Sequence, residues 1–351
     1  MTTPRAATAG PLSVGMFISN HQLPGDDPVR FLGQQLELVA RLSDGGWDSA
    51  FVGQHFLLDG VRKAQPFPYL ARMAAEAGTM RLGAAIILAA LTNPVEVAET
   101  VATLDVITGG RFVLGAGLGY REVAFQAFGV EKGQRAHRLE TNLRVIRGLL
   151  DGDTLDLDEP WCRLEGATMV NRPVQEHVPI WLGANGDRGV ARAARIADTW
   201  IINPQASIDT VARQMEVFRA TREELGLAPD PSELPALKEV FCAETREEAF
   251  AIVGPHLEAK YRSYLDSGQL DQLPEGEELG DSLERLAHRR FIIGSPDDCV
   301  AAMRTWQAVV GVDHFVLRTE WETMEHEVAR RSVELLTTEV LPRVQQEAPV
   351  A

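Results

Sequence analysis

Short apolar runs rich in β-branched residues recur along the chain, and almost every one is followed by a helical pattern. The runs are continuous rather than alternating in polarity, which is typical of parallel strands buried on both faces. Eight of them on a chain of 351 residues predict an α/β fold of the (β/α)8 TIM-barrel type rather than an open sheet. The predicted strands are residues 14–19, 49–53, 81–89, 112–117, 180–183, 199–203, 236–243 and 313–317.

Two stretches do not fit the minimal barrel, and we expect them to be insertions after strands four and seven. Residues 151–179 contain short apolar pieces and Pro173, which predicts a hairpin. Residues 267–290 include an acidic run, which predicts a mobile loop. Active sites of such barrels lie at the carboxyl ends of the strands, so this segment is a candidate lid, with a solvated loop as the alternative. We expect one domain over residues 12–351, preceded by a disordered lead, 1–11.

Composition excludes several function classes. The formal charge is 34 − 50 = −16, and no basic stripe interrupts it, which argues against nucleic-acid binding. No run of eighteen apolar residues occurs, so we expect no membrane span. The three cysteines are far apart in sequence and form no CxxC pair, which favours buried thiols in a reducing, cytoplasmic setting. The histidines show no ligand spacing, so no metal site is expected.

One block of the sequence is more informative about function than the composition is. Residues 81–151 contain NPVEVAE, LDVITGGRFVLGAGLGY and FQAFGV, followed by Arg135. GWDSAFVGQHF stands at strand two, VPIWLGANGDRGVARAARIADTW at strands five and six, and FIIGSPDDCV later. Together these pieces resemble the luciferase-like flavin monooxygenases. The resemblance implies a TIM barrel with a flavin at the carboxyl ends of the strands. It also implies either reduced FMN with O₂ or hydride transfer by the deazaflavin F420.

The turn after strand five is the first candidate for cofactor binding. Its small residues let backbone N–H groups and the positive end of a helix face an anion. By resemblance it forms part of the flavin phosphate site, made by Gly183, Ala184, Asn185, Gly186 and Gly189. The alternative is a tight turn in which glycine only permits a positive φ. Asp187, an awkward neighbour for a phosphate, is expected to cap the helix instead.

Arg135 matches the family's phosphate-contacting arginine, and a guanidinium can grip a phosphate with two hydrogen bonds. The alternative is an exposed arginine paired with Glu131 or Glu140. Leu118 stands where luciferases proper have another arginine just after strand four. That departure either weakens the phosphate site or leaves the contact to backbone donors.

The third strand and the end of the second are the next candidates. Ala85-Ile86 aligns with a non-prolyl cis peptide that supports the flavin ring in the family, although core packing explains small residues there equally well. His55 is a candidate acid, base or substrate donor near neutral pH, and a hydrogen-bonded structural histidine is the alternative. Gln54 precedes it, where relatives have a histidine or an acidic residue.

Three aromatic residues are candidates for the pocket wall, namely Phe56, Trp200 and Trp321. Buried packing is the alternative for both tryptophans. Two other kinds of functional site are not indicated by the sequence. Tyr120 occupies the position where a dinucleotide-binding GxGxxG motif needs its third glycine. His21 follows strand one without a second histidine two residues away, so a barrel metallohydrolase site is not expected.

Three hypotheses for function follow. The first is a two-component monooxygenase: a separate flavin reductase supplies reduced FMN, which reacts with O₂ to a C4a-hydroperoxide that oxidises a small organic substrate. The second is an F420-dependent oxidoreductase, for which Arg62 and Lys63 offer weak support because the tail of F420 is acidic. The third is a non-catalytic flavin-binding barrel, kept open by the residues at positions 54 and 118.

The resemblance also implies a homodimer that uses the helices of the second and third units. Apolar faces at residues 67–77 and 95–107 are compatible with that interface. The same faces would also be needed to cover the barrel.

Overall fold

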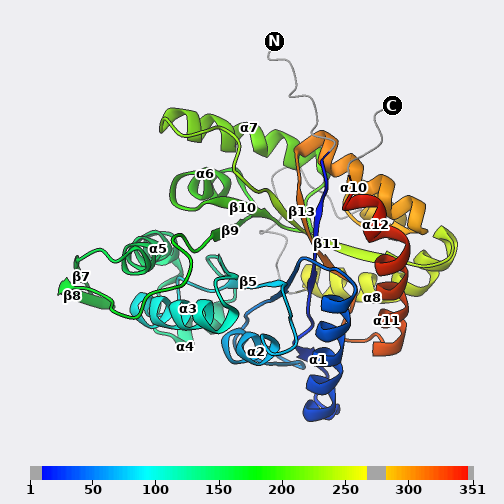
Figure 1. Ribbon diagram of the computed structural model, residues 1–351, viewed down its shortest axis with the longest axis horizontal. Helices are drawn as coiled ribbons and strands as arrows, with labels where there is room; N and C mark the ends of the chain where they lie inside the picture. Colours follow the sequence, from blue (N-terminus) through cyan, green and yellow to red (C-terminus); the bar gives the residue numbers. More distant parts are fainter. Residues whose placement is uncertain (1–9, 267–281, 347–351) are drawn as a thin grey trace.

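Parallel strands form a closed barrel in a computed structural model, which describes residues 10–266 and 282–346. The pairing of Ile202 with Ala236 closes the ring, and helices surround it (Figure 1). The predicted TIM barrel is confirmed, and each predicted run coincides with a strand. The barrel strands are β1 (Ser13–Phe17), β3 (Ser49–Val52), β5 (Arg81–Ile87), β6 (Phe112–Ala116), β9 (Ile180–Ala184), β10 (Thr199–Ile202), β11 (Pro235–Cys242) and β13 (His314–Arg318).

Local signals at the helix ends explain where the helices begin and stop. The Asn93 side chain accepts hydrogen bonds from the backbone N–H groups of Val95 and Glu96, and Gly109 ends the same helix in the left-handed region. The helices are α1 (Pro28–Asp44), α2 (Pro66–Met73), α3 (Pro94–Thr108), α4 (Glu122–Ala127), α5 (Arg135–Asp151), α6 (Asp187–Ile196), α7 (Ile208–Glu224), α8 (Arg246–Asp266), α9 (Leu283–Ala287), α10 (Pro296–Val310), α11 (His326–Leu335) and α12 (Leu341–Val344).

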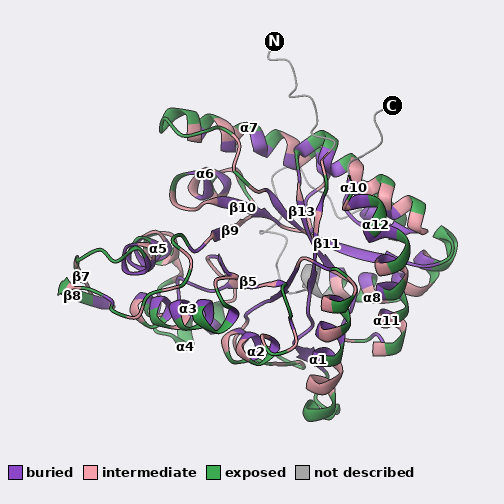
Figure 2. Cartoon of the chain, in the orientation of Figure 1, coloured by how far each residue is buried: buried purple, intermediate pink, exposed green. Residues whose placement is uncertain are grey.

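The strands contribute to two separate apolar cores, because successive side chains point to opposite faces. Phe51, Trp181 and Val316 belong to a cluster without helical residues, which fills the barrel interior. Ala50 and Leu182 belong instead to the larger cluster between strands and helices. In Figure 2 the barrel strands are mostly buried, and the helices are exposed mainly on their outer faces. Because both faces of the barrel strands pack against apolar residues, these strands are continuous apolar runs in the sequence.

A buried polar network closes the end of the barrel where the strands begin. Ser49 Oγ lies 2.7 Å from His314 Nε2, and His314 Nδ1 lies 2.7 Å from Glu233 Oε1. Arg81 donates to the same Glu233 oxygen at 2.6 Å. The order of groups resembles a hydrolase triad, but Ser49 is fully buried. The network therefore links β3 and β13, the two strands that pair with β1, at the base of the barrel. It does not offer an accessible nucleophile.

The first predicted insertion is a hairpin, as expected. Strands β7 (Leu155–Glu159) and β8 (Cys162–Ala167) pair antiparallel between α5 and β9. The hairpin packs along α5, where Trp161 Nε1 donates to Asn142 Oδ1 at 2.9 Å. The guanidinium of Arg138 lies 4.3 Å from the centre of the same indole ring.

The second predicted insertion lies largely outside the described residues, which resume at 282, and so does most of the predicted N-terminal lead. The described remainder, residues 282–290, contains α9, and the short strand β12 (Ile292–Gly294) follows it and pairs with β11. Within residues 10–266 and 282–346, no helix combines the length and apolarity needed to cross a membrane.

Candidate active site

A cavity of about 560 Å³ opens at the carboxyl ends of the barrel strands. Its volume is in the range of small-molecule and cofactor sites. Residues far apart in sequence meet there because parallel strands end at one rim. The cavity collects most of the residues singled out from the sequence: Gln54, His55, Ala85, Ile86, Leu118, Arg135, Gly183, Ala184, Asn185, Gly186 and Gly189.

One side of the cavity is built to face an anion. Helix α6 begins at Asp187 after Gly186, which has no side chain to cap it. The first backbone N–H groups of the helix are therefore left for a ligand, and the helix dipole adds to their positive potential. The adjoining turn is held in place from α7, where Gln214 donates to the carbonyl of Asn185 at 2.6 Å. Asn203 also hydrogen-bonds the Asn185 side chain.

Asp187 does not cap α6 as expected. Its carboxylate forms a bidentate ion pair with Arg213, at 2.7 and 3.0 Å. The hydrogen bond from Arg213 is the main reason why the pKa of Asp187 is lowered. The negative charge beside the turn is therefore compensated by a residue outside the cavity lining.

Arg135, the first residue of α5, lines the cavity. Its guanidinium donates to the carbonyl of Lys132 at 2.9 Å. The alternative pairing with Glu140 does not occur, because Glu140 binds Arg192 at 2.6 Å. Within the described residues Arg135 has no carboxylate partner, so its charge is available to a ligand.

The peptide between Ala85 and Ile86 is cis, as the resemblance implied. A Cβ added to Gly117 would lie 2.7 Å from Ile86 Cδ1, so the absence of a side chain leaves room for Ile86. Gln54 holds this part of β5: its backbone N–H donates to the carbonyl of Ile86 at 3.0 Å. Its side-chain oxygen accepts from the N–H of Leu88 at 2.8 Å. Gln54 therefore supports the cavity wall as well as lining it.

The imidazole of His55 lies in the cavity between two other rings. Its centroid is 6.5 Å from that of His21 and 5.9 Å from that of Tyr120. Burial, followed by the positive charge of Lys63, lowers the pKa of His55 to about 3. The ring is neutral near pH 7, and it makes no hydrogen bond to a described residue. This arrangement does not match the alternative of a hydrogen-bonded structural histidine.

The three aromatic candidates lie outside the lining of this cavity. Phe56 contacts Phe128, with 4.7 Å between ring centroids, and borders two other hollows, both also bordered by His55. Trp200 is buried between strands and helices and donates to the carbonyl of Ala184 at 3.0 Å. Trp321 packs with residues of α8 and donates to Glu239 at 3.0 Å. For both tryptophans the buried-packing alternative applies.

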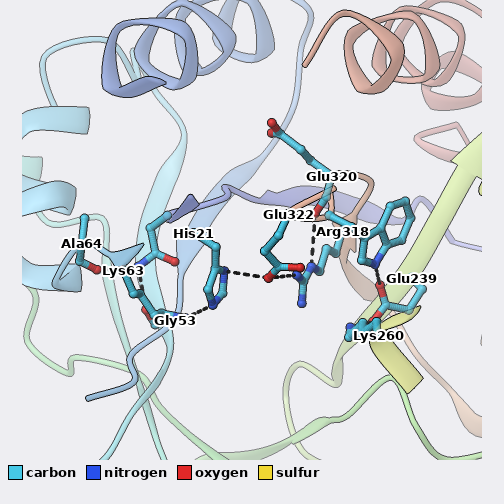
Figure 3. A network of polar contacts seen from close by, with 11 residues as sticks. His21, Gly53, Lys63, Ala64, Glu239, Lys260, Arg318, Glu320 and Glu322 are labelled. Carbon is cyan, nitrogen blue, oxygen red and sulfur yellow. Dashed lines mark hydrogen bonds and ion pairs between the residues drawn. The ribbon is translucent and has the colours of Figure 1, made fainter. Parts of the chain in front are cut away.

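The cavity lining also includes residues that were not candidate site residues, among them His21, Lys63 and Arg318. His21 and Lys63 face each other across the antiparallel pair of β2 (His21–Gln22) and β4 (Arg62–Lys63), with 2.8 Å between Nε2 and Nζ. Figure 3 shows them in one polar network with Arg318 and Glu322. Arg318 ends a barrel strand, His21 follows β1 by four residues, and Lys63 follows β3 by eleven, so only the first two carry a signal at a strand end.

This fold and rim cavity define a barrel enzyme of the class that binds cofactors at its strand ends. Residues 12–314 match the family of luciferase-like monooxygenases, and the chain belongs to that family.

Two curated relatives align over most of both chains. One is 4-hydroxyprotoasukamycin monooxygenase of Streptomyces nodosus subsp. asukaensis, which is 27% identical over 344 residues, covering 95% of this chain and 92% of the relative. The other is the F420-dependent glucose-6-phosphate dehydrogenase of Nakamurella multipartita, which is 27% identical over 329 residues, covering 88% and 91%.

Solved structures share the fold. The oxygenating constituent of 3,6-diketocamphane monooxygenase from Pseudomonas putida, in complex with FMN, superposes with a TM-score of 0.79 at 18% identity, covering 96% of this chain and 99% of that one. An F420-dependent secondary alcohol dehydrogenase superposes with a TM-score of 0.76 at 18% identity, covering 96% and 100%.

Proposed function

We propose that this chain is a two-component monooxygenase that binds reduced FMN in the rim cavity and oxidises a small organic substrate with O₂. The observation that carries the proposal is the polarity of the cavity. One end presents the uncapped start of α6 and the guanidinium of Arg135, and the middle is apolar around Ile86. A molecule with one phosphate and a flat tricyclic ring matches that distribution.

The residues of the chain would bind the cofactor and shield it. The backbone N–H groups at the start of α6 and the side chain of Arg135 would hold the phosphate. Gly117 and Gly183 leave room beside Ile86 for a ring. Leu118 and Leu182 add apolar wall and exclude water. When bound, reduced FMN supplies the electrons that activate O₂.

His55 would position the substrate or move a proton. A neutral imidazole donates at one nitrogen and accepts at the other. Because the pKa of His55 is lowered to about 3, the ring keeps both capacities across the physiological range. It lies in the same cavity as Ile86, where the flavin ring would rest.

The charges at the phosphate-binding end of the cavity favour FMN over a cofactor with a long acidic tail. Arg135 and Arg188 line this end without a carboxylate partner among the described residues, whereas Arg192 is compensated by Glu140. Two free guanidinium groups suit a single phosphate. The monooxygenase relative, which aligns over nearly the whole chain, points the same way.

A second candidate is an F420-dependent oxidoreductase that transfers a hydride. It is favoured by the neutral ring of His55, which can accept a hydrogen bond from the hydroxyl group of an alcohol and so orient it. The dehydrogenase relative supports it. Equilibrium titration with FMN and with F420 separates the two: tighter binding of FMN supports the monooxygenase, and tighter binding of F420 supports the alternative.

The monooxygenase proposal includes a separate flavin reductase as partner. Tyr120 occupies the third-glycine position of a nicotinamide-dinucleotide motif, so the reducing equivalents are expected to arrive with the flavin. Mixing the protein with photoreduced FMN and then with O₂ tests the proposal. We expect anaerobic binding of the reduced flavin and a reoxidation rate that differs from that of free FMN. Absence of binding would eliminate it.

We also propose a homodimer that uses α2 and α3. Support comes from the end of α3, where Val106 and Ile107 are 53% and 48% exposed. Apolar side chains gathered at such a surface favour association. Sedimentation equilibrium of the protein, with a Val106→Glu/Ile107→Glu variant as comparison, tests this interface.

A further inference from the structure

A second hollow lies beside the rim cavity, between the loop that follows β3 and the end of α4. Its volume is about 570 Å³. We call it the apolar hollow, because most of its lining residues are apolar: Phe56, Leu57, Leu58, Val61, Ala127 and Phe128. Leu57 and Phe128 are 58% and 43% exposed, so the described residues cover their side chains only in part. A concave apolar surface of this kind favours the binding of an apolar group.

The loop that forms one wall of the hollow is held in place by α4. Arg121, immediately before this helix, donates to the carbonyls of Phe56 and Leu57 at 3.0 and 2.8 Å. Its guanidinium also lies 3.6 Å from the carboxylate of Asp59. Leu57 has a φ of 52°, in the left-handed region that is uncommon for a residue with a bulky side chain. These contacts fix the loop, so the shape of the hollow does not depend on an occupant.

Polar side chains of the hollow gather where it borders the rim cavity. They belong to His55, Lys63 and Gln65, and the first two also line the rim cavity. The amide of Gln65 is already used, because it accepts from Gln54 at 3.3 Å and donates to the carbonyl of His55 at 3.2 Å. Among its described lining residues, the hollow therefore offers polar side chains to a ligand at His55 and Lys63.

Lys63 supplies an amine at this border. Its Nζ lies 2.8 Å from His21 Nε2, which leaves further positions around the amine for a ligand. The carboxylate of Glu322 stands on the other side of His21, 3.6 Å from its Nδ1 and 3.3 Å from Arg318 Nη2 (Figure 3). Because a carboxylate of the chain already faces these groups, a ligand does not need to bring another. A neutral oxygen fits beside Lys63.

We propose that the apolar hollow binds the aromatic ring of a phenolic substrate, with the phenol oxygen hydrogen-bonded to Lys63. The inference rests on the proposed function, because it places the substrate next to His55 and to the cavity in which the flavin is expected. An aromatic ring fits better than an alkyl chain, because Phe56 and Phe128 offer it two rings whose centroids are 4.7 Å apart and whose planes are tilted by 52°.

Lys63 would also activate this ring. Burial, followed by the positive charge of Arg318, lowers the pKa of Lys63 well below its usual value. An unprotonated amine can accept the hydroxyl proton, which moves from the phenol oxygen to Nζ and leaves a phenolate beside an ammonium. No electrons are transferred in this step. The phenolate ring is richer in electrons than the phenol and is therefore more easily oxidised, as the proposed monooxygenase requires.

Titration of the full chain with para-nitrophenol and with its methyl ether, para-nitroanisole, tests the proposal. The ether keeps the ring but has no proton to give up. We expect para-nitrophenol to bind more tightly than the ether. Bound para-nitrophenol should also show the visible absorbance of its ionised form, at a pH at which most of the free compound is protonated.

Two variants separate the amine from the apolar wall. Lys63→Met should weaken the binding of para-nitrophenol by about tenfold or more. It should also remove the visible absorbance and leave the affinity for the ether unchanged. Phe128→Ala should weaken the binding of both ligands by about threefold or more. Intact FMN binding in each variant shows that it folds.

Two exposed neighbours provide matched controls. Arg62 adjoins Lys63 on β4 and donates to the carbonyl of Asp26. Val123 on α4 is 41% exposed but does not line the hollow. Arg62→Met and Val123→Ala should leave both affinities unchanged. Equal losses in the Arg62 and Lys63 variants, or in the Val123 and Phe128 variants, would show a general effect of charge or of apolar surface and would overturn the proposal.

Four other outcomes would also overturn it. Binding of para-nitrophenol that is unchanged in Lys63→Met, or that is lost in Arg135→Leu, would place the phenol elsewhere. Tighter binding of hexanol than of para-nitrophenol at the Phe128-dependent site would contradict an aromatic ring. Loss of self-association in Phe128→Ala, with no effect on either ligand, would show that a second copy of the chain covers the hollow.

Measurement of FMN binding keeps this inference separate from the function on which it rests. Failure of the phenol site with intact FMN binding overturns the inference and leaves the proposed function standing. Absence of FMN binding in the parent protein removes the function itself.

Discussion

Asp187 and Arg213 form a bidentate ion pair beside the start of α6, with oxygen–nitrogen distances of 2.7 and 3.0 Å. Arg213 does not line the cavity, yet it compensates the one carboxylate at the turn proposed to hold the flavin phosphate. Without it, the carboxylate would repel a phosphate and compete for the free N–H groups of the helix.

Replacement of Arg213 by Met is therefore expected to weaken the binding of FMN by about threefold or more. The affinity for riboflavin, which lacks the phosphate, should not change. Fluorescence titration measures both dissociation constants. Adding Asp187→Asn to the Arg213 variant should restore FMN affinity, because the repelling charge is removed. If the double variant binds FMN as weakly as the single one, the ion pair serves the fold and not the phosphate.

Two glycines on or next to β6 separate the demands of the fold from those of the cavity. A Cβ at Gly115 would lie 2.0 Å from the backbone oxygen of Ala84, whereas one at Gly117 would meet the flexible end of Ile86. Gly115→Ala should lower the free energy of unfolding by about 1–3 kcal/mol or more. Gly117→Ala should fold normally but bind FMN and riboflavin less tightly. Urea denaturation and flavin titration test the pair, and equal destabilisation by both would contradict this division.

The fold was predictable from sequence because barrel strands are buried on both faces and stand out as continuous apolar runs. The start of α6 and Arg135 were predictable for another reason: a short turn and a helix start carry their signal in adjacent residues. The capping role expected of Asp187 was not realised, because its partner Arg213 lies on the following helix, which sequence proximity does not reveal.

The cavity wall was harder to predict. Trp200 and Ile201 are neighbours on β10, but Ile201 packs in the barrel interior and Trp200 packs against the helices. Which face each residue takes depends on strand register, which an apolar run does not encode. Lys63 and Arg318 come from strand ends more than 250 positions apart in sequence, so only the closed ring brings them together.

The polar network at the base of the barrel predicts a pH dependence of stability. Burial opposes ionisation of Glu233, but the hydrogen bonds and charges of His314 and Arg81 outweigh it and lower its pKa from 4.5 to about 2. A lowered carboxyl pKa stabilises the folded state above pH 4.5, and this stability is lost as the pH falls toward 2. The contribution is about 3 kcal/mol by linkage.

Glu233→Gln is expected to abolish that contribution. Urea denaturation between pH 2 and pH 7 should show a shallower acid decline for the variant than for the parent protein. Identical pH slopes in the two proteins would contradict the ionised Glu233–His314 pair. Glu131→Gln, at an exposed position without an ion pair among the described residues, is the control and should follow the parent.

The neutral state of His55 is directly measurable. Because burial and nearby cations lower its pKa to about 3, its ring proton resonances should not titrate between pH 5 and pH 8 in NMR spectra, assigned by comparison with His55→Gln. An inflection of the His55 resonances near pH 6.5 would contradict the proposed acceptor role at neutral pH.

The central claim is that a flavin lies in the rim cavity with its phosphate held by Arg135 and the start of α6. Parallel titration of FMN and riboflavin against the parent, Arg135→Leu and Arg144→Leu tests it most directly, because Arg144 is an exposed arginine on the same helix. We predict that FMN binds more tightly than riboflavin. Arg135→Leu, but not Arg144→Leu, should weaken the binding of FMN by about ten- to a hundredfold. Equal affinities for the two flavins, or FMN binding that is indifferent to Arg135, would contradict the account.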